Sequence, residues 1–481
     1  MTRVLATLHR WISIVLCLMF ALWFTSGIVM IYVPFPSLSD SERIDRAAVI
    51  DISKVNSLSE ALDATGVKTA NRLRLLQYQQ RPILVAEGDN NVVAASFADS
   101  SEIVKPLTKS DAIAIAKRFS NTSVASVSGP LSYDQWVVHD RFDPFRPFLR
   151  VEMADSIGTH LYISTKSTEV LQKTNRNQRT WNYLGAVVHW IYPTVIRKNW
   201  ALWDQIVWWV SLVCIIGVLT GLVLGIQHWQ IAKQRGLKGL ASPFSGWLAW
   251  HHKIGLISGF VVLFWIFSGW LSMDHGRLFS VPNPTAQQIA DMRGMNLSET
   301  LNAIQLEDLY EAAGAKEIEL TALNKQTLVV ARNAKTSKLI PIGSGQIYDR
   351  GSLISAVEFA VSKAWPDNVV SDSYIVPVND VYANLREGSL GEETLRLILD
   401  DATETWIHVN LTDGGLISIM DNSRRIYRWL FNGIHSLDIP GIVNHRFIWS
   451  LIMVLLMSVG LIFCITGIVL AFKKITKTVL R

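Results

Sequence analysis

Charge is scarce in this sequence, and four long stretches contain none. Only 18% of the 481 residues are Asp, Glu, Lys or Arg, while 49% are hydrophobic, which excludes an ordinary soluble protein of this size. The uncharged stretches span residues 11–33, 206–226, 254–273 and 447–472. Each is long enough to cross about 30 Å of hydrocarbon as a helix. We therefore predict four transmembrane helices.

Acidic residues are missing from three segments next to these stretches, which carry only basic residues: Arg3, Arg10, Lys233, Arg235, Lys238, Lys473, Lys474, Lys477 and Arg481. Lys and Arg near helix ends stay in the cytoplasm, so we expect both termini inside and nearly all soluble residues in the periplasm of a bacterial inner membrane. A signal peptide is the alternative for the first stretch, but the stretch is too long and no small-residue cleavage site follows it.

This topology predicts eight segments in order. They are transmembrane helix 1 at 1–33, a first periplasmic region at 34–200, helix 2 at 201–228, a cytoplasmic loop at 229–250, helix 3 at 251–273, a second periplasmic region at 274–445, helix 4 at 446–472 and a cytoplasmic tail at 473–481.

Cysteine is also scarce, and its three copies, Cys17, Cys214 and Cys464, all fall inside predicted helices. The periplasmic regions therefore have no disulfide framework. The formal charge of +5 comes largely from the cytoplasmic flanks, which indicates contact with the lipid bilayer and excludes a nucleic-acid partner. No Gly-x-Gly-x-x-Gly motif stands between a strand and a helix, so any reductant must be quinol or a separate cytoplasmic donor.

The chain repeats itself. A shift of 246 residues superposes His189 on His435, Trp203 on Trp449 and Gly221 on Gly467, and a shift of 242 superposes His9 on His251. We predict an internal duplication whose units are related by a pseudo-two-fold axis along the membrane normal, so that equivalent residues face each other across the bundle.

The periplasmic regions alternate helical and strand patterns in the same order. In the first, we expect helices at 57–64 and 107–119 and strands at 73–76, 148–151, 159–163 and 170–171. In the second, we expect helices at 301–313 and 352–364 and strands at 318–323, 395–399, 405–409 and 416–419, with an Asp-Gly-Gly turn at 413–415. The pattern predicts α+β modules with antiparallel sheets.

A helix, two strands, a turn and a last strand leading to a membrane helix resembles the PepSY domain. His9-Arg10-Trp11 at the start of the first predicted span and the His-His-Lys-Ile-Gly run at 251–255, which opens the third, resemble the PepSY-associated transmembrane family over nearly the whole chain. This resemblance implies haem and iron chemistry of the siderophore-reductase kind. The turn at 164–168 departs from the pattern, because it lacks the glycine of the second copy.

Four histidines are the candidate metal ligands. His9 and His251 lie at the cytoplasmic ends of their helices, and His189 and His435 lie towards the periplasm. Imidazole is the usual axial ligand of haem iron, and facing helices commonly hold such ligands. Two sites near opposite faces predict two haem b groups that bridge the membrane. The alternative for each ring is an interfacial histidine, and His252 is a possible substitute ligand without a partner in the repeat.

Every predicted membrane helix also contains Ser or Thr followed by Gly, and the four glycines are Gly27, Gly221, Gly269 and Gly467. Close helix packing is the simpler explanation. In the haem hypothesis, these glycines lie at the two levels of the histidine pairs and leave room for a flat ligand.

Weaker candidates for contact with an iron complex outside the membrane are His139, His160, His408, Arg150, Arg396, Arg179 and Arg425, for which solvated or strand-pairing roles are the alternative. His228, His275 and His445 lack repeat partners and are expected at the interface.

We predict an oxidoreductase that passes electrons outward to ferric iron or a ferric siderophore. The alternative is a non-redox PepSY module that binds a peptide, peptidase or transporter component. A homodimer is left open.

Overall fold

Four long helices form a bundle at one end of the molecule. In this computed structural model the described residues are 2–277, 279, 284–342, 349–383, 385, 389–391 and 393–479. The helices are α1 (Thr2–Tyr32), α8 (Trp200–Gln234), α9 (Gly246–Leu271) and α15 (Arg446–Val479). Each is long and apolar enough to cross a membrane. Helix α1 packs against α8 and α15, and α9 packs against the same two helices, so α1 lies diagonally opposite α9.

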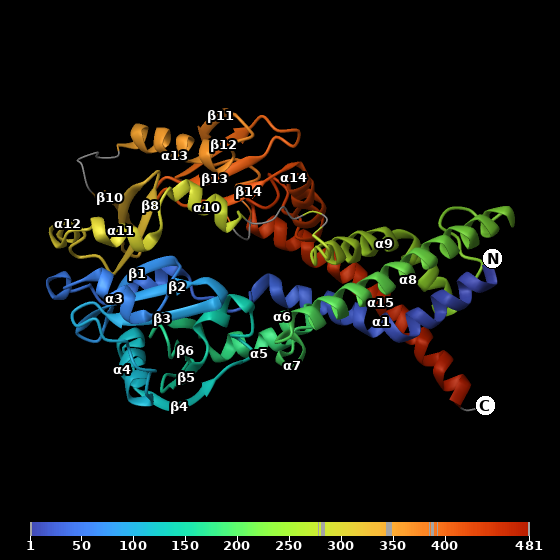
Figure 1. Cartoon of the computed structure of the whole chain (residues 1–481). Helices are drawn as coiled ribbons and strands as arrows, with labels where there is room; N and C mark the ends of the chain where they lie inside the picture. The colour runs from blue at the N-terminus through green and yellow to red at the C-terminus, as the bar shows by residue number, and fades with distance from the viewer. Residues whose placement is uncertain are drawn as a thin grey trace.

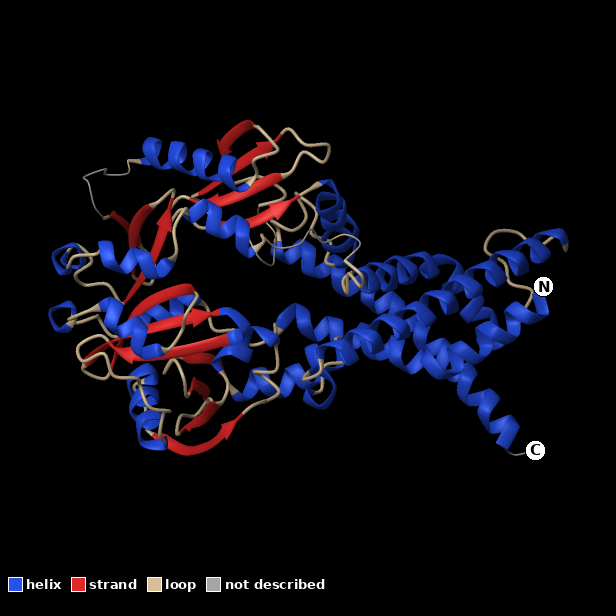
Figure 2. Ribbon diagram, in the orientation of Figure 1, coloured by secondary structure: helices blue, strands red, loops and turns tan. Residues whose placement is uncertain are grey.

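The sheets gather at the other end of the molecule, while both termini and the loop between α8 and α9 lie at the end far from the sheets (Figures 1 and 2). Helices α8 and α9 run past the predicted bounds of 228 and 251, and α15 continues past 472. Long basic side chains allow this, because their apolar stems can lie along a helix while the charges reach water.

One six-stranded antiparallel sheet joins the two halves of the chain. Its order is β10-β9-β8-β1-β2-β3. The strands are β1 (Ala70–Tyr78), β2 (Arg81–Gly88), β3 (Val92–Phe97), β8 (Glu317–Leu323), β9 (Gln326–Arg332) and β10 (Ser337–Pro341). At its centre β1 pairs with β8, and Leu73 lies opposite Leu320. Because β1 and β8 come from different halves, the two soluble regions are one continuous structure.

Each half also builds a four-stranded antiparallel sheet with its strands in chain order. The first contains β4 (Val124–Leu131), β5 (Phe148–Met153), β6 (His160–Ser164) and β7 (Val170–Thr174). The second contains β11 (Val370–Ile375), β12 (Thr394–Leu399), β13 (Trp406–Asn410) and β14 (Leu416–Met420). Alternating buried residues along these strands turn one face inward.

Two helices fill the space between the sheets. Helix α4 (Lys109–Ser120) buries Ala112, Ile115 and Phe119 against side chains of β1, β2, β5 and β6. Helix α13 (Arg350–Ala364) buries Leu353 and Val357 against β8, β9, β12 and β13. Helices α3 (Leu58–Thr65), α11 (Leu297–Ala303) and α12 (Leu306–Tyr310) cover the other face of the six-stranded sheet. The sheets are therefore held by apolar burial on both faces of the shared sheet.

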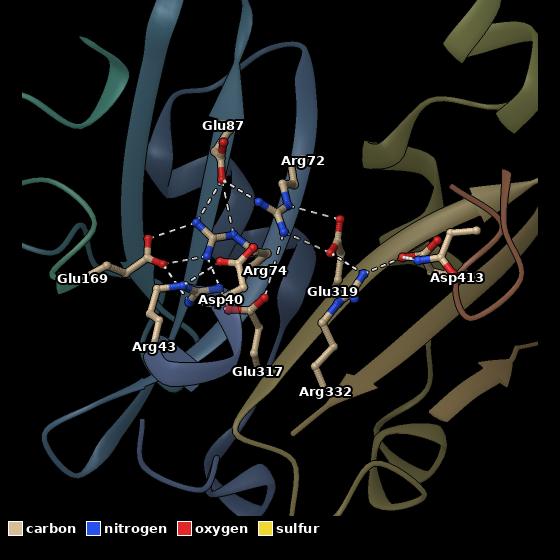
Figure 3. A network of polar contacts seen from close by, with 11 residues as sticks. Asp40, Arg43, Arg72, Arg74, Glu87, Glu169, Glu317, Glu319, Arg332 and Asp413 are labelled. Carbon is tan, nitrogen blue, oxygen red and sulfur yellow. Dashed lines mark hydrogen bonds and ion pairs between the residues drawn. The ribbon is translucent and has the colours of Figure 1, made fainter. Parts of the chain in front are cut away.

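Charged side chains cross the seam between β1 and β8 (Figure 3). The guanidinium of Arg74, only 3% exposed, contacts Glu169 at 2.6 Å and Glu317 at 3.4 Å. Arg43 contacts the same two carboxylates. Burial alone would raise the pKa of Glu169, but attraction to Arg74 and Arg43 outweighs it and lowers this pKa to about 2. Glu169 therefore depends on Arg74 and Arg43 for its stability as a buried anion, and Glu317 shares the same two arginine partners.

The antiparallel sheets and most local elements are as predicted, but two expectations are wrong. The helix expected at 301–313 is split into α11 and α12. It breaks because Gln305 and Asp308 form a capping box that begins a new helix. One strand was expected upstream in each half, whereas each half contributes three strands to the shared sheet.

Candidate functional site

Two pairs of histidines face each other inside the bundle. The sheet-side pair, His189 and His435, has ring centroids 6.2 Å apart. The terminus-side pair, His9 and His251, has ring centroids 6.5 Å apart. About 25 Å separates the two levels, since Ser26, at the level of His189, follows His9 by 17 positions of α1 with a rise of about 1.5 Å each.

The sheet-side pair stands on short helices that pack against the bundle. His189 ends α6 (Ala186–His189), which follows α5 (Arg176–Leu184), and His435 follows α14 (Asn422–Arg428) and a single π-turn, η4 (Trp429–Gly433). In both halves a tryptophan indole donates to the histidine carbonyl at 2.9 Å, Trp23 to His189 and Trp265 to His435. These bonds tie the backbone of each histidine to α1 or α9.

The same two membrane helices orient the sheet-side rings. His189 Nδ1 lies 3.1 Å from Ser26 Oγ and 3.2 Å from the Trp23 carbonyl. His435 Nδ1 lies 3.2 Å from Ser268 Oγ and 3.3 Å from the Trp265 carbonyl. The two environments are alike to within about a tenth of an ångström in each contact, as the matched positions predict.

Neighbouring helices anchor the terminus-side rings. His9 Nδ1 of α1 lies 3.0 Å from the Gly217 carbonyl of α8. His251 Nδ1 of α9 lies 2.9 Å from Thr466 Oγ1 of α15, and this hydroxyl donates to the Phe463 carbonyl. The Phe463 ring also stacks on His251 at 4.7 Å between centroids.

These contacts decide which nitrogen carries the proton. Carbonyl oxygens only accept, and the Thr466 hydroxyl already donates its proton, so Nδ1 is the donor at His9, His189, His251 and His435. Within the described part of the chain, Nε2 of these four rings makes no hydrogen bond. Each ring thus keeps an Nε2 lone pair for a ligand, with its other nitrogen fixed as metal-bound imidazoles require.

The spacing of the rings fits a shared metal ion. Two imidazoles bound to one metal through Nε2 place their centroids roughly 6 Å apart, because each metal–nitrogen bond is about 2 Å and each nitrogen lies about 1 Å from its ring centre. The observed separations of 6.2 and 6.5 Å match this value. The separation of the rings at each level is therefore compatible with two imidazoles that share one ion.

The four glycines lie at the predicted levels, and each lies next to a histidine ring. A Cβ on Gly221 would lie 2.6 Å from His9 Cε1, and one on Gly269 would lie 3.2 Å from His435 Cε1. At Gly27 and Gly467 the nearest ring atoms, Cε1 of His189 and His251, would be 3.5 and 3.6 Å away. The glycines let each imidazole approach the helix closely.

A cavity of about 530 Å³ surrounds the sheet-side pair, a volume typical of sites for small molecules and cofactors. Its lining includes matched residues of the two halves, namely Trp23 and Trp265, Gly27 and Gly269, Val207 and Met453, and Trp203 and Trp449. The lining is mainly aromatic and aliphatic, while His139, Asp140 and Arg197 add polar groups. A largely apolar ligand with a polar edge suits this lining.

The remaining histidines have other partners. His252 Nε2 donates to the Gly225 carbonyl at 2.9 Å, so it turns towards α8 and does not replace His251. His228 contacts the Leu224 carbonyl, and His275 contacts Asp204 at 2.6 Å, which interfacial placement did not predict. His445 is exposed.

The arginines singled out from the sequence have mainly structural contacts. Asp380 binds Arg396 through both carboxylate oxygens at 2.7 and 3.0 Å, and Arg396 donates to His408. Burial and the Arg396 charge lower the pKa of His408 to about 3. The same positions of the first half hold Asp134, Arg150 and Tyr162, again in contact.

The other outer candidates do not assemble a site either. Arg179 and Arg425 donate to backbone carbonyls. Burial lowers the pKa of His160 to about 4. Among the outer candidates only His139 reaches the cavity.

Sequence reasoning missed Arg197 and the anchoring role of the matched tryptophans and serines at the sheet-side pair. Arg197 follows Trp190 and Tyr192 and precedes Trp200 and Trp203. A charge inside such an aromatic stretch was the available signal. The anchors were detectable as matched Trp-x-x-Ser-Gly segments at 23–27 and 265–269.

Comparison with known proteins gives one positive finding. The family model described as the PepSY-associated TM region matches residues 6–474. No curated protein matches the chain.

Proposed function

Because the chain belongs to the PepSY-associated transmembrane family, we propose that it is an inner-membrane haem b reductase that carries electrons to ferric iron or a ferric siderophore in the periplasm. The observation that carries this proposal is the pair of facing imidazoles at each of two levels of the bundle, with Nδ1 anchored and Nε2 directed away from the anchors. Haem supplies reversible one-electron chemistry when it is bound in this way.

The donor sets support two haem groups. His9 and His251 would hold one, and His189 and His435 would hold the other, with one ligand from each half of the chain at each level. Hydrogen bonds from Nδ1 to Gly217, Thr466, Trp23 and Trp265 make each imidazole a better electron donor and keep the ring from rotating.

The lining of the cavity supports an apolar macrocycle at the sheet-side pair. Trp203, Trp449, Met453 and Val207 would contact its faces and edges and exclude water. A dry, apolar surround is one of the ways in which a protein tunes the reduction potential of bound haem.

The charge pattern supports a periplasmic location for the sheets. Basic residues gather at the terminus end of the bundle, and the sheets lie at the other end (Figure 1), which is the arrangement that the positive-inside rule associates with sheets outside the cytoplasm. Electrons would enter near His9 and His251 from quinol or a cytoplasmic donor and leave near His189 and His435.

Absorbance of the purified protein tests the proposal. We expect reduced b-type bands and two haem groups per chain. His9→Ala or His189→Ala should lower the haem content by about half, because each removes one ligand of one pair. His445→Ala is the matched control, since this exposed residue has no predicted ligand role and should leave both haem groups in place.

Colourless protein from haem-replete cells would contradict the proposal. In that case the non-redox alternative, a PepSY module that binds a peptide or a transporter component, would account for the large soluble regions. Reduction of periplasmic ferric complexes by spheroplasts with and without the protein separates the two functions, because only a reductase should raise the rate. That increase should be lost in the His9→Ala and His189→Ala variants.

A further inference from the structure

Arg197 brings a buried positive charge to the edge of the cavity. It ends the one-turn helix α7 (Thr194–Arg197), is only 4% exposed and lines the cavity. Three aromatic rings surround its guanidinium, with centroids at 4.9 Å for Trp203, 5.3 Å for Tyr192 and 5.5 Å for Trp200. Such rings stabilise a cation through their π-electrons but do not neutralise it.

The carboxylate nearest to this charge does not pair with it well. Asp140 lies 3.6 Å from Arg197 through its Oδ1 atom, is about half exposed, and contacts His139 Nδ1 at 2.5 Å. The Nε atom of Arg197 is buried and has no hydrogen-bond partner. A buried guanidinium with an unused donor beside a half-exposed carboxylate favours a further anion within the cavity, because a buried donor without a partner is costly.

This charge has no equivalent in the second half. Two tryptophan pairs and one glycine pair line the cavity from matched positions of the two halves, but the position equivalent to Arg197 at a shift of 246 is Val443. Among the described residues that line the cavity, only the first half therefore offers an Arg or Lys side chain to a ligand between His189 and His435. A ligand with an anionic edge would bind in one of the two orientations that the pseudo-symmetry allows.

We propose that Arg197 binds a propionate carboxylate of the haem held by His189 and His435, which fixes the orientation of that haem and raises its reduction potential. This inference rests on the proposed function. Arg binds carboxylates through two parallel hydrogen bonds, and a nearby cation stabilises the more negative, reduced state of the haem. Arg197 is thus a positioning residue, and it favours electron transfer from the terminus-side site to the sheet-side site.

Redox titration of the purified holoprotein, followed by absorbance, tests the inference. In Arg197→Gln, we expect the ratio of ferrous to ferric form of one of the two haem groups to fall at least tenfold at a fixed potential. This fall corresponds to a reduction potential about 59 mV lower for a one-electron couple. The other haem should be unchanged. Arg197→Lys should keep most of the potential, because it keeps the charge.

Resonance Raman spectroscopy supplies a readout of the contact itself. The propionate-bending band should shift in both Arg197→Gln and Arg197→Lys, since neither side chain reproduces the two parallel hydrogen bonds. Val443→Gln is the matched control at the equivalent position and should change neither the band nor the potentials. If Arg197→Gln folds poorly, the band in Arg197→Lys still decides the question.

Failure of this inference differs from failure of the proposed function. Two haem groups with wild-type potentials in Arg197→Gln, or an unshifted Raman band in Arg197→Lys, would overturn the role of Arg197 and leave the reductase in place. Wild-type protein without haem would overturn both.

Discussion

At the scale of single residues, each imidazole of the two pairs is held through Nδ1 by a group on a neighbouring helix. In three of the four rings, Nδ1 donates to a backbone carbonyl. Such an anchor leaves Nε2 as the only nitrogen able to bind a metal. The ring positions therefore depend on close helix contact, which small residues provide.

Gly221 and Gly467 form a matched test of this dependence. A Cβ on Gly221 would lie 2.6 Å from His9 Cε1 and 3.0 Å from His9 Nδ1, closer than atoms pack, whereas a Cβ on Gly467 would lie an ordinary 3.6 Å from His251 Cε1. We expect Gly221→Ala to displace His9 and remove about half of the bound haem. Gly467→Ala should keep both haem groups, as measured by haem content per chain.

Helix propensity cannot produce this difference, because alanine favours a helix over glycine by about 1 kcal/mol at either position. Gly221→Ala protein with full haem content and an unchanged spectrum would show that the His9 ring is not constrained by α8.

The sequence predicted the histidine pairs because equivalent positions recur at fixed shifts. It did not predict Arg197, since this residue has no equivalent in the second half and its position in the cavity depends on how α7 packs beside α8. Residues that break a repeat are invisible to an argument that rests on the repeat.

At the scale of elements, the seam between β1 and β8 combines apolar pairing on one face with buried charges on the other. Leu73 and Leu75 pair with Leu320 and Ile318. Arg74 lies opposite Glu319 in the same register. The seam therefore couples the folding of the two halves.

Removing Arg74 should destabilise the soluble domains strongly. Arg74→Met leaves Glu169 and Glu317, whose side chains are 9% and 1% exposed, with fewer partners. We expect a loss of about 3–5 kcal/mol in the free energy of unfolding, typical of a broken buried ion pair. Pulse proteolysis in urea would measure it.

Arg72→Met is the control for this change, because Arg72 lies on the same strand with its side chain 40% exposed. Its loss should cost about 1 kcal/mol or less, as is usual for exposed pairs. Equal effects of the two substitutions would mean that the buried charges at the seam contribute nothing beyond surface pairing.

Local periodicity predicted α4, α13 and most strands of the four-stranded sheets, since their burial patterns lie within short windows. The pairing of β1 with β8 could not be predicted in this way. Leu73 and Leu320 are about 250 residues apart in sequence, and alternation along each strand does not identify its partner.

At the scale of the whole molecule, the chain separates a helical end from a sheet end, with both termini at the helical end (Figure 2). The basic residues of the sequence predicted this grouping of termini and loop before any contact was known. The side of the membrane on which each end lies stays a prediction.

Cysteine labelling tests this orientation. The three native cysteines are buried in the bundle, so they should react slowly with a membrane-impermeant maleimide. Lys335→Cys in the sheet end should be labelled in spheroplasts, and Lys238→Cys in the loop between α8 and α9 only after permeabilisation, because both positions are exposed. The reverse pattern would place the sheets in the cytoplasm.

Each histidine pair draws one ring from either half, so neither half holds a complete pair. A polypeptide with a single unit would have to meet a second copy of itself to finish either site, and its assembly would depend on its concentration. On the predicted duplication, joining two copies in one chain makes that encounter intramolecular. It also frees the copies to diverge, and the contrast between Arg197 and Val443 is the kind of difference that an identical pair of subunits could never acquire.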